Sequence, residues 1–136
     1  MSLNIRTGIG ERGPRLIQYL LAGRENMQEG LHVIGRVKLD FPSLRVYEAT
    51  FSVTAQVSNF GIAGKAQLVD VTNGDALIHE FNISDDEPTQ YEAIVFLDRG
   101  QVQEFELRAG LNTGGGYGIS DFLQIMTAAI NIRSTF

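Results

Sequence analysis

The most regular pattern of hydrophobic and polar positions in this chain runs from Val46 to Ser58. Apolar and polar residues alternate strictly there, so the apolar side chains share one side of an extended chain. The apolar positions are Tyr47, Ala49, Phe51, Val53, Ala55 and Val57. A long strand with one wet face and one buried face needs a second layer to cover the buried face. The pattern therefore predicts a two-layer β structure organised around this strand.

The other apolar runs are short and separated by turn residues, which is typical of an all-β domain. Leu16–Leu21 is either a buried strand or one helical turn, because periodicity cannot decide for so short a run. Gly23–Gly30 reads as a loop, and Gly35 marks a candidate bulge in the strand that follows. We expect the further strands at Leu31–Leu39, Lys65–Val71, Ala76–Ile83, Tyr91–Leu97, Val102–Ala109 and Ile119–Ile132.

Alternation also predicts which residues of the last two strands face the core. In Val102–Ala109 we expect three residues to point inward (Phe105, Leu107 and Ala109) and three outward (Glu104, Glu106 and Arg108). In Ile119–Ile132 we expect one face to hold Met126, Ala128, Ile130 and Ile132.

The sequence Thr72-Asn73-Gly74-Asp75 between two apolar runs predicts a β-hairpin. Asn-Gly suits a type I′ turn because both central residues need positive φ. A two-residue turn would place Val69 opposite Ile78 and Leu68 opposite His79. Both faces of this hairpin are partly apolar, so we expect both to be covered, by the chain itself or by another chain.

About eight strands without a long helix predict an all-β fold, an antiparallel β-sandwich, and within that class a jelly roll. We expect one such domain over residues 16–136, preceded by an extended N-terminal arm over residues 1–15. The arm is rich in glycine and contains Pro14, which disfavours a place inside a sheet. It is either a flexible tail or a segment that becomes ordered on a partner.

Composition narrows the classes of partner. The 136 residues are 43% hydrophobic, enough for a core, and carry a formal net charge of −5, which disfavours nucleic acid and anionic membranes as partners. The arm carries three arginines and Glu11, a net charge of +2, so the remainder carries −7. The chain has no cysteine, which excludes disulfides, thiolate zinc sites and cysteine nucleophiles. No run approaches the roughly 20 apolar residues of a membrane span, and no signal peptide is visible.

Two glycine-rich segments are candidates for phosphate binding, and neither has the required context. Gly8–Gly13 matches G-x-G-x-x-G, but Pro14 follows at once and no strand precedes it, so a dinucleotide site is not predicted. Gly110–Gly118 lacks the Lys-Ser/Thr pair of a phosphate loop and reads as a surface loop. Within it, Tyr117 is a candidate contact residue for a partner, because an aromatic ring gives much contact area at low entropy cost.

No catalytic, cofactor or metal site is predicted, and we do not expect an enzyme. His32 and His79 lack a third partner for catalysis and read as structural residues. Glu104 and Glu106 lie about 7 Å apart on one strand face. They could form a glycosidase pair, but two solvated carboxylates on an exposed face are far commoner. Two acidic turns hold oxygen ligands of the kind calcium prefers, and the sequence leaves calcium binding open. These turns contain Asp70, Asn73 and Asp75, and Asp85, Asp86 and Glu87.

In architecture the chain resembles the small jelly-roll decoration (cement) proteins on the heads of tailed bacteriophages. The resemblance is carried by the arm, the strand Tyr47–Val57, the Val-Thr-Asn-Gly-Asp hairpin, and the pair Tyr91–Leu97 and Val102–Ala109. It implies a non-enzymatic structural protein of the virion, assembled in the host cytoplasm as a dimer or trimer. The implied partner is the major capsid protein or another virion subunit, with no cofactor, nucleic acid or membrane. Arm contacts to the shell would come from Arg6, Arg12 and Arg15.

Three alternatives remain open at this point. A carbohydrate-binding or receptor-binding β-sandwich would need exposed aromatic residues, and the chain has no tryptophan. A hydrolase or lectin-like enzyme would use the acidic loops. A phage tail or baseplate subunit would have the same chemistry as a head protein.

Overall fold

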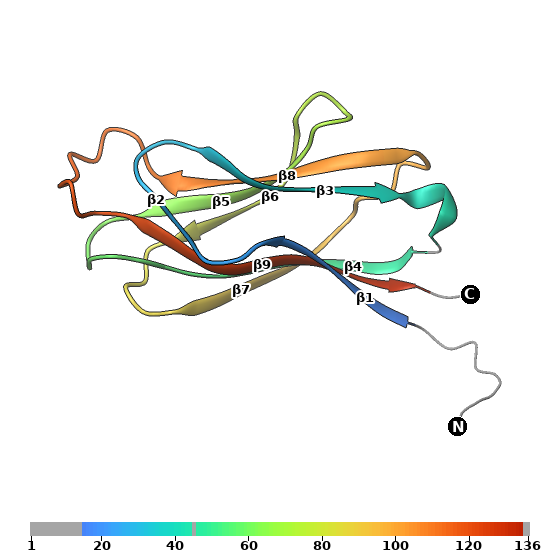
Figure 1. Cartoon of the computed structure of the whole chain (residues 1–136), viewed down its shortest axis with the longest axis horizontal. Helices are drawn as coiled ribbons and strands as arrows, with labels where there is room; N and C mark the ends of the chain where they lie inside the picture. The colour runs from blue at the N-terminus through green and yellow to red at the C-terminus, as the bar shows by residue number, and fades with distance from the viewer. Residues whose placement is uncertain (1–14, 45, 135–136) are drawn as a thin grey trace, which may run out of the picture.

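The computed structural model describes residues 15–44 and 46–134, with the side chains of Arg15, Val46 and Tyr47 outside that description. This part of the chain forms nine strands and one 3₁₀ turn (Figure 1). The strands are β1 (Arg15–Ala22), β2 (Glu25–Met27), β3 (His32–Asp40), β4 (Val46–Val57), β5 (Gly64–Asp70), β6 (Ala76–Ile83), β7 (Thr89–Val95), β8 (Val102–Leu111) and β9 (Leu123–Ser134). The 3₁₀ turn, η1, spans Phe41–Ser43. No described helix is long or apolar enough to cross a bilayer.

The strands form two antiparallel sheets packed face to face, in the orders β1-β9-β4-β7 and β3-β8-β5-β6, with β2 added to β9. Four of the pairs are nested along the chain: β5 with β6, β4 with β7, β3 with β8, and β1 with β9. The chain is thus one long hairpin rolled into two layers, which is the jelly-roll arrangement. The predicted antiparallel sandwich and jelly roll are confirmed, and Leu16–Leu21 is strand rather than helix.

The core lies between the sheets and is centred on the strand that the alternation predicts. Its inward residues are between 0% and 4% exposed: Ala49, Phe51, Val53, Ala55 and Val57. The Phe51 ring stacks on Phe81 with centroids 5.1 Å apart, and Phe41 meets Phe105 edge-on at 6.1 Å. Such aromatic pairs stabilise a core by about 0.5–1.5 kcal/mol beyond the area they bury. The core therefore rigidly fixes both sheets.

The predicted hairpin is present, but its turn is longer than expected. Leu68 pairs with His79 as predicted, whereas Val69 pairs with Leu77 rather than Ile78, because the register shifts by one residue. Positive φ occurs at Gly74 and Asp75, not at Asn73 and Gly74. The cause lies in Asp70, whose carboxylate accepts hydrogen bonds from the backbone and side-chain nitrogens of Asn73 at 3.3 and 2.7 Å.

Strand β9 also differs from its predicted pattern. It begins at Leu123 instead of Ile119, and its register against β4 shifts between Thr127 and Ile125. This β-bulge accommodates one extra residue, so Met126 does not share the buried face of Ala128, Ile130 and Ile132. The short strand β2, inside the predicted loop Gly23–Gly30, was not expected either.

The connections gather at two ends of the sandwich (Figure 1). The start of β1 and the end of β9 lie at the same end as η1 and the β7–β8 connection. The β4–β5, β6–β7 and β8–β9 loops lie at the other end. Residues 1–14 are outside the described residues, so the arm stays a prediction, and β1 begins at Arg15, the residue predicted to end that arm.

Candidate interaction surface

The outer faces of the two sheets differ in their chemistry. The face of β3-β8-β5-β6 carries a network of alternating charges centred on Glu106, which is 6% exposed. Arg36 Nε lies 3.0 Å from Glu106 Oε2, and Arg108 Nη2 lies 2.8 Å from Glu106 Oε1. The hydrogen bonds that Arg108 donates to Glu106 raise the pKa of Arg108 above its ordinary value, with Asp75 adding to the effect. Lys65 and Glu80 extend the network, with Nζ and Oε2 3.7 Å apart. This face is paired within itself and solvated.

The outer face of β1-β9-β4-β7 is nearly neutral, and we call it the neutral face. It consists of side chains that alternate with the core residues of these four strands, together with Phe96, which directly follows β7. Its members are Leu16, Gln18, Leu20, Glu48, Thr50, Ser52, Thr54, Gln90, Glu92, Ile94, Phe96, Thr127, Ala129, Asn131 and Arg133. Charged side chains among these are Glu48, Glu92 and Arg133. Small hydroxyl, amide and methyl groups occupy its centre.

A hydrogen-bonded row crosses the middle of the neutral face. Gln18 Nε2 donates to Asn131 Oδ1 at 3.0 Å, and Asn131 Nδ2 donates to Ser52 Oγ at 3.2 Å. Toward the end of the sheet, Arg133 Nε lies 3.6 Å from Glu48 Oε1. These contacts join β1, β9 and β4, so the polar groups of this face are held in fixed positions.

Apolar side chains border the neutral face on both edges. On β1, Leu16 and Leu20 are 69% and 62% exposed. At the β7 edge, Ile94 is 64% exposed and Phe96 is 91% exposed. Large apolar groups left this open at both edges of a sheet face mark a surface suited to contact with another macromolecule.

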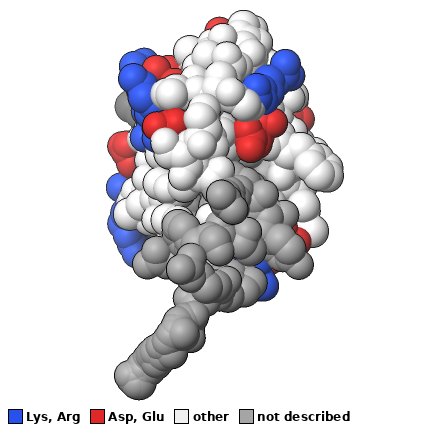
Figure 2. Space-filling view, turned by 90° about the vertical axis from the view of Figure 1, so that its right-hand side faces the viewer, with Lys and Arg blue, Asp and Glu red and all other residues white. Residues whose placement is uncertain are grey.

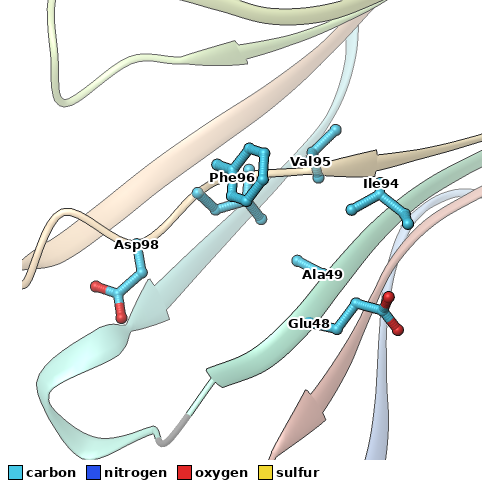
Figure 3. Close-up of a pocket in the computed structure, with 7 residues that line it drawn as sticks. Glu48, Ala49, Ile94, Val95, Phe96 and Asp98 are labelled. Atoms are coloured by element: carbon cyan, nitrogen blue, oxygen red, sulfur yellow. The ribbon is translucent and has the colours of Figure 1, made fainter.

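A groove of about 460 Å³ lies at the β7 edge (Figure 3). Three buried residues line it, Ala49, Val95 and Leu97. The other lining residues are exposed or half-buried: Glu48, Ile94, Phe96 and Asp98. The groove therefore combines an apolar floor with two carboxylates, a composition that fits an apolar side chain from a partner.

Figure 2 shows the end of the sandwich next to this groove. Acidic and basic side chains are interspersed on the visible described surface, and uncharged surface separates them. Contacts at this end therefore depend on shape and on individual ion pairs rather than on a broad field of one sign.

Of the residues predicted from sequence to bind a partner, the structure describes Tyr117 in full and Arg15 in part. Tyr117 is half-buried at the opposite end, where its hydroxyl donates to the backbone oxygen of Ala63 at 3.3 Å and its ring packs against the core. Its loop neighbour Ile119 is far more open, at 94% exposure. Arg6 and Arg12 lie outside the described residues, and Arg15 is described only as the first backbone residue of β1. Partner binding by these residues stays a prediction.

Several of the candidate chemical groups make local contacts. His32 Nε2 lies 3.1 Å from the backbone oxygen of Glu29, and the His79 ring packs edge-on against Phe81 with centroids 4.7 Å apart. Asp85 Oδ2 accepts a hydrogen bond from Thr89 Oγ1 at 3.1 Å. In the described part of the chain, no three histidine or carboxylate side chains converge as metal ligands would.

No protein-family model matches the sequence, and no curated protein matches it. Solved structures with a similar fold include the VP2 subviral particle of infectious bursal disease virus, at a TM-score of 0.57 and 10% identity over 90% of this chain and 33% of that one. The T13 viral particle of the same virus matches with a TM-score of 0.53 and 9% identity, over 90% of this chain and 31% of that one. The chain thus spans about a third of these proteins. At such identities the similarity shows the fold alone, a β-sandwich of the kind found in viral particles.

A weaker similarity joins the chain to a carbohydrate-binding module, CBM36, solved with calcium and xylotriose. The TM-score is 0.46 at 14% identity, over 87% of this chain and 99% of that one. A similarity at this level carries no argument about function.

Proposed function

We propose that this chain is a non-enzymatic structural protein of a viral particle, and that it serves as a decoration (cement) protein that stabilises the shell. The observation that carries the proposal is the jelly roll, which aligns over 90% of the chain with proteins of viral particles. The partner would be the major capsid protein or another subunit of the virion. The protein would reside in the virion after assembly in the host cytoplasm.

The distribution of polar and apolar groups supports this function. The sandwich has a close-packed core and one outer face that is nearly neutral and bordered by Leu16, Leu20, Ile94 and Phe96. A subunit of an assembly needs such a rigid body with apolar contact area. The net charge of the arm, opposite to that of the body, suits a segment that docks through Arg6, Arg12 and Arg15.

Immunogold electron microscopy tests the proposal directly. Antibodies raised against the purified chain should label the outside of intact viral particles produced by cells that carry its gene. Gold on heads supports decoration, gold on tails supports the tail or baseplate alternative, and particles without gold would overturn the structural role. Particles produced after deletion of the gene should also lose integrity at a lower temperature than particles that contain the protein.

The arm has its own test. Because β1 begins at Arg15, deletion of residues 1–14 removes all of the predicted arm except Arg15 and does not cut into the strand. We expect the truncated chain to unfold at the same temperature as the full chain and to lose particle labelling. The matched control is the full chain with Arg24→Ala, an arginine between β1 and β2 outside the arm, which should still label particles. Retained labelling by the truncated chain would contradict docking through the arm.

A carbohydrate-binding function is the second candidate, favoured by one observation. A polar hollow of about 290 Å³ on the neutral face is lined by Leu16, Glu48, Thr50, Glu92, Asn131 and Arg133. Amide, carboxylate and guanidinium groups of this kind bind sugar hydroxyls, although none of the six is an aromatic platform. A glycan array with the wild-type chain and with Asn131→Ala decides this: binding that the substitution abolishes supports the second function.

A further inference from the structure

We propose that the neutral face is the interface of a homodimer whose two-fold axis runs parallel to the strands and places β1 of one copy over β7 of the other. This inference deepens the proposed function, because it names a second copy of the chain as the occupant of the neutral face. The strand register, the charges and the area of the face support it.

The register of the sheet sets an ordered row of side chains near its end. Leu16 is paired with Arg133, and Arg133 with Glu48. Val95 is paired with Ala49, so Phe96 follows at the level of Glu48. Across the sheet from β1 to β7, the row therefore reads Leu16, Arg133, Glu48 and Phe96, an apolar group at each edge and an ion pair between them.

A two-fold axis parallel to the strands reverses the order of this row in the partner and keeps its level. Leu16 then lies over the partner's Phe96, and Arg133 lies over the partner's Glu48. Each contact occurs twice, because such an interface is self-complementary. Apolar groups meet apolar groups and the charges meet their opposites, so this row fits itself.

The next rows are compatible with the same axis. Gln18 would lie over the partner's Ile94, and Asn131 over the partner's Thr50. Ala129 would face the partner's Ser52, and Leu20 would reach the margin beside the partner's Glu92. Small groups at the centre allow the sheets to approach closely, while the exposed Leu20 and Glu92 lie at the rim.

A two-fold axis perpendicular to the strands fits less well. It would stack β1 on β1 and β9 on β9. With the axis through the row of Asn131 and Thr50, Arg133 would lie over the partner's Ala129 and Phe96 over the partner's Glu92. With the axis through the row of Arg133 and Glu48, each of these charges would lie over its own copy, so like charges would meet. The order of charges and apolar groups therefore selects the parallel axis.

The area of the face is close to what a stable dimer needs. Strands β4 and β9 each have 12 residues, and four strands lie side by side. At about 3.3 Å per residue and about 4.8 Å between strands, the flat area is roughly 600 Å² before side-chain relief is counted. Standard interfaces bury about 800 Å² per partner and have few charges at their centre. The charged outer face of the other sheet does not meet that description.

Two variants that introduce opposite charges at facing positions test the interface and the direction of its axis together. One chain has a mass of 15.0 kDa, and sedimentation equilibrium of the wild-type protein should give twice this mass. Leu16→Lys and Phe96→Glu should each give monomers, since each homodimer would hold two uncompensated charges against apolar groups. Mixed in equal amounts, the two variants should form a dimer with one copy of each. One contact of that dimer pairs lysine with glutamate, and the other is native.

Matched controls use exposed apolar residues outside the neutral face. Leu77, on β6 of the other sheet, is 54% exposed, and Phe60, in the β4–β5 loop, is 88% exposed. Leu77→Lys and Phe60→Glu should remain dimers, and thermal unfolding should show that all four variants are folded. A monomeric or trimeric wild-type chain, or a mixture that stays monomeric, would overturn the proposal. Dissociation of either control would do the same. Particle labelling is measured separately, so failure of the dimer and failure of the proposed function are distinguishable.

Discussion

Gln103 Nε2 donates a hydrogen bond to Asp70 Oδ2 over 2.9 Å, and both residues are fully buried. The same nitrogen donates to the backbone oxygen of Leu97 at 2.8 Å, and Gln103 Oε1 accepts from the backbone nitrogen of Arg99 at 2.7 Å. Since Asp70 also holds Asn73, this one amide joins the β5–β6 turn to the β7–β8 connection. The contact thereby fixes the segment that lines the groove beside Phe96.

Replacing Gln103 should therefore cost stability out of proportion to its size. In Gln103→Leu the buried carboxylate of Asp70 loses a donor, and we expect the free energy of unfolding to fall by about 2–4 kcal/mol. Urea unfolding followed by circular dichroism measures the change. Asn82→Leu, at an exposed position of β6 outside the neutral face, is the matched control and should stay within about 0.5 kcal/mol of the wild-type chain. A loss below about 1 kcal/mol in Gln103→Leu would show that the amide is dispensable.

Two glycines allow backbone segments to approach closely, and neither position has room for the methyl group of alanine. A Cβ on Gly35 would lie 1.8 Å from the backbone oxygen of Leu21, and one on Gly110 would lie 1.6 Å from that of Gly30. Since backbone atoms cannot rotate aside, we expect Gly35→Ala and Gly110→Ala to destabilise the fold by about 3 kcal/mol or more. Chemical unfolding or soluble yield measures this.

Gly23 provides the control for this pair. Nothing lies within 4 Å of a Cβ built there, and its φ is outside the left-handed region. Gly23→Ala should be neutral or stabilising by up to about 1 kcal/mol, because alanine restricts the unfolded chain. Equal losses at all three glycines would mean that close backbone approach is not the cause.

Alternation reveals burial in this chain as long as the strands stay regular. It identifies the inward face of β4 correctly, and it places Phe105, Leu107 and Ala109 in the core. It fails at Met126, because the bulge in β9 depends on pairing with β4, about 70 residues earlier in the chain. The three residues of β2 carry no periodicity of their own and are strand only because they pair with β9. Gly35 could be read as a bulge, but not as the point where β1 approaches β3.

Only part of the neutral face could be predicted from the sequence. The polar positions Thr50, Ser52 and Thr54 indicate an outward face, and local alternation is enough to find them. That Gln18, Asn131 and Ser52 form one row depends on pairings between β1, β9 and β4, which local sequence does not encode. Glu106 shows the same limit: it does point outward as predicted, yet Arg36 and Arg108 cover it.

The two arginines on Glu106 should contribute unequally to stability. The Arg108 side chain is 26% exposed and contacts both Glu106 and Asp75, whereas the Arg36 side chain is 62% exposed. Because exposed ion pairs contribute little, we expect Arg36→Ala to cost below about 1 kcal/mol and Arg108→Ala about 1–3 kcal/mol. A double-mutant cycle with Glu106→Gln measures the coupling to each arginine. A larger loss at Arg36 would reverse this assignment.

Tyr91 should make stability depend on pH in the alkaline range. Burial raises the pKa of its hydroxyl above the ordinary value of 10.0, and the charge of Asp85 raises this pKa further, against a hydrogen bond from Thr89. Because the folded state favours the protonated phenol, the stability from this group is fully present below the unfolded pKa. It is lost as the pH rises through the higher folded pKa.

Tyr91→Phe isolates this contribution. The substitution keeps a ring to pack against Phe81, whose centroid lies 5.7 Å from that of Tyr91. As the pH rises past 10.0, the wild-type chain should lose stability relative to Tyr91→Phe, as measured by urea unfolding across the pH series. The difference in tyrosinate absorbance between the two chains gives the pKa of Tyr91 itself. Asp85→Asn should lower that pKa, while Asp86→Asn, the neighbouring carboxylate, should leave it unchanged. A Tyr91 pKa at or below the ordinary value would contradict the proposed effect of burial.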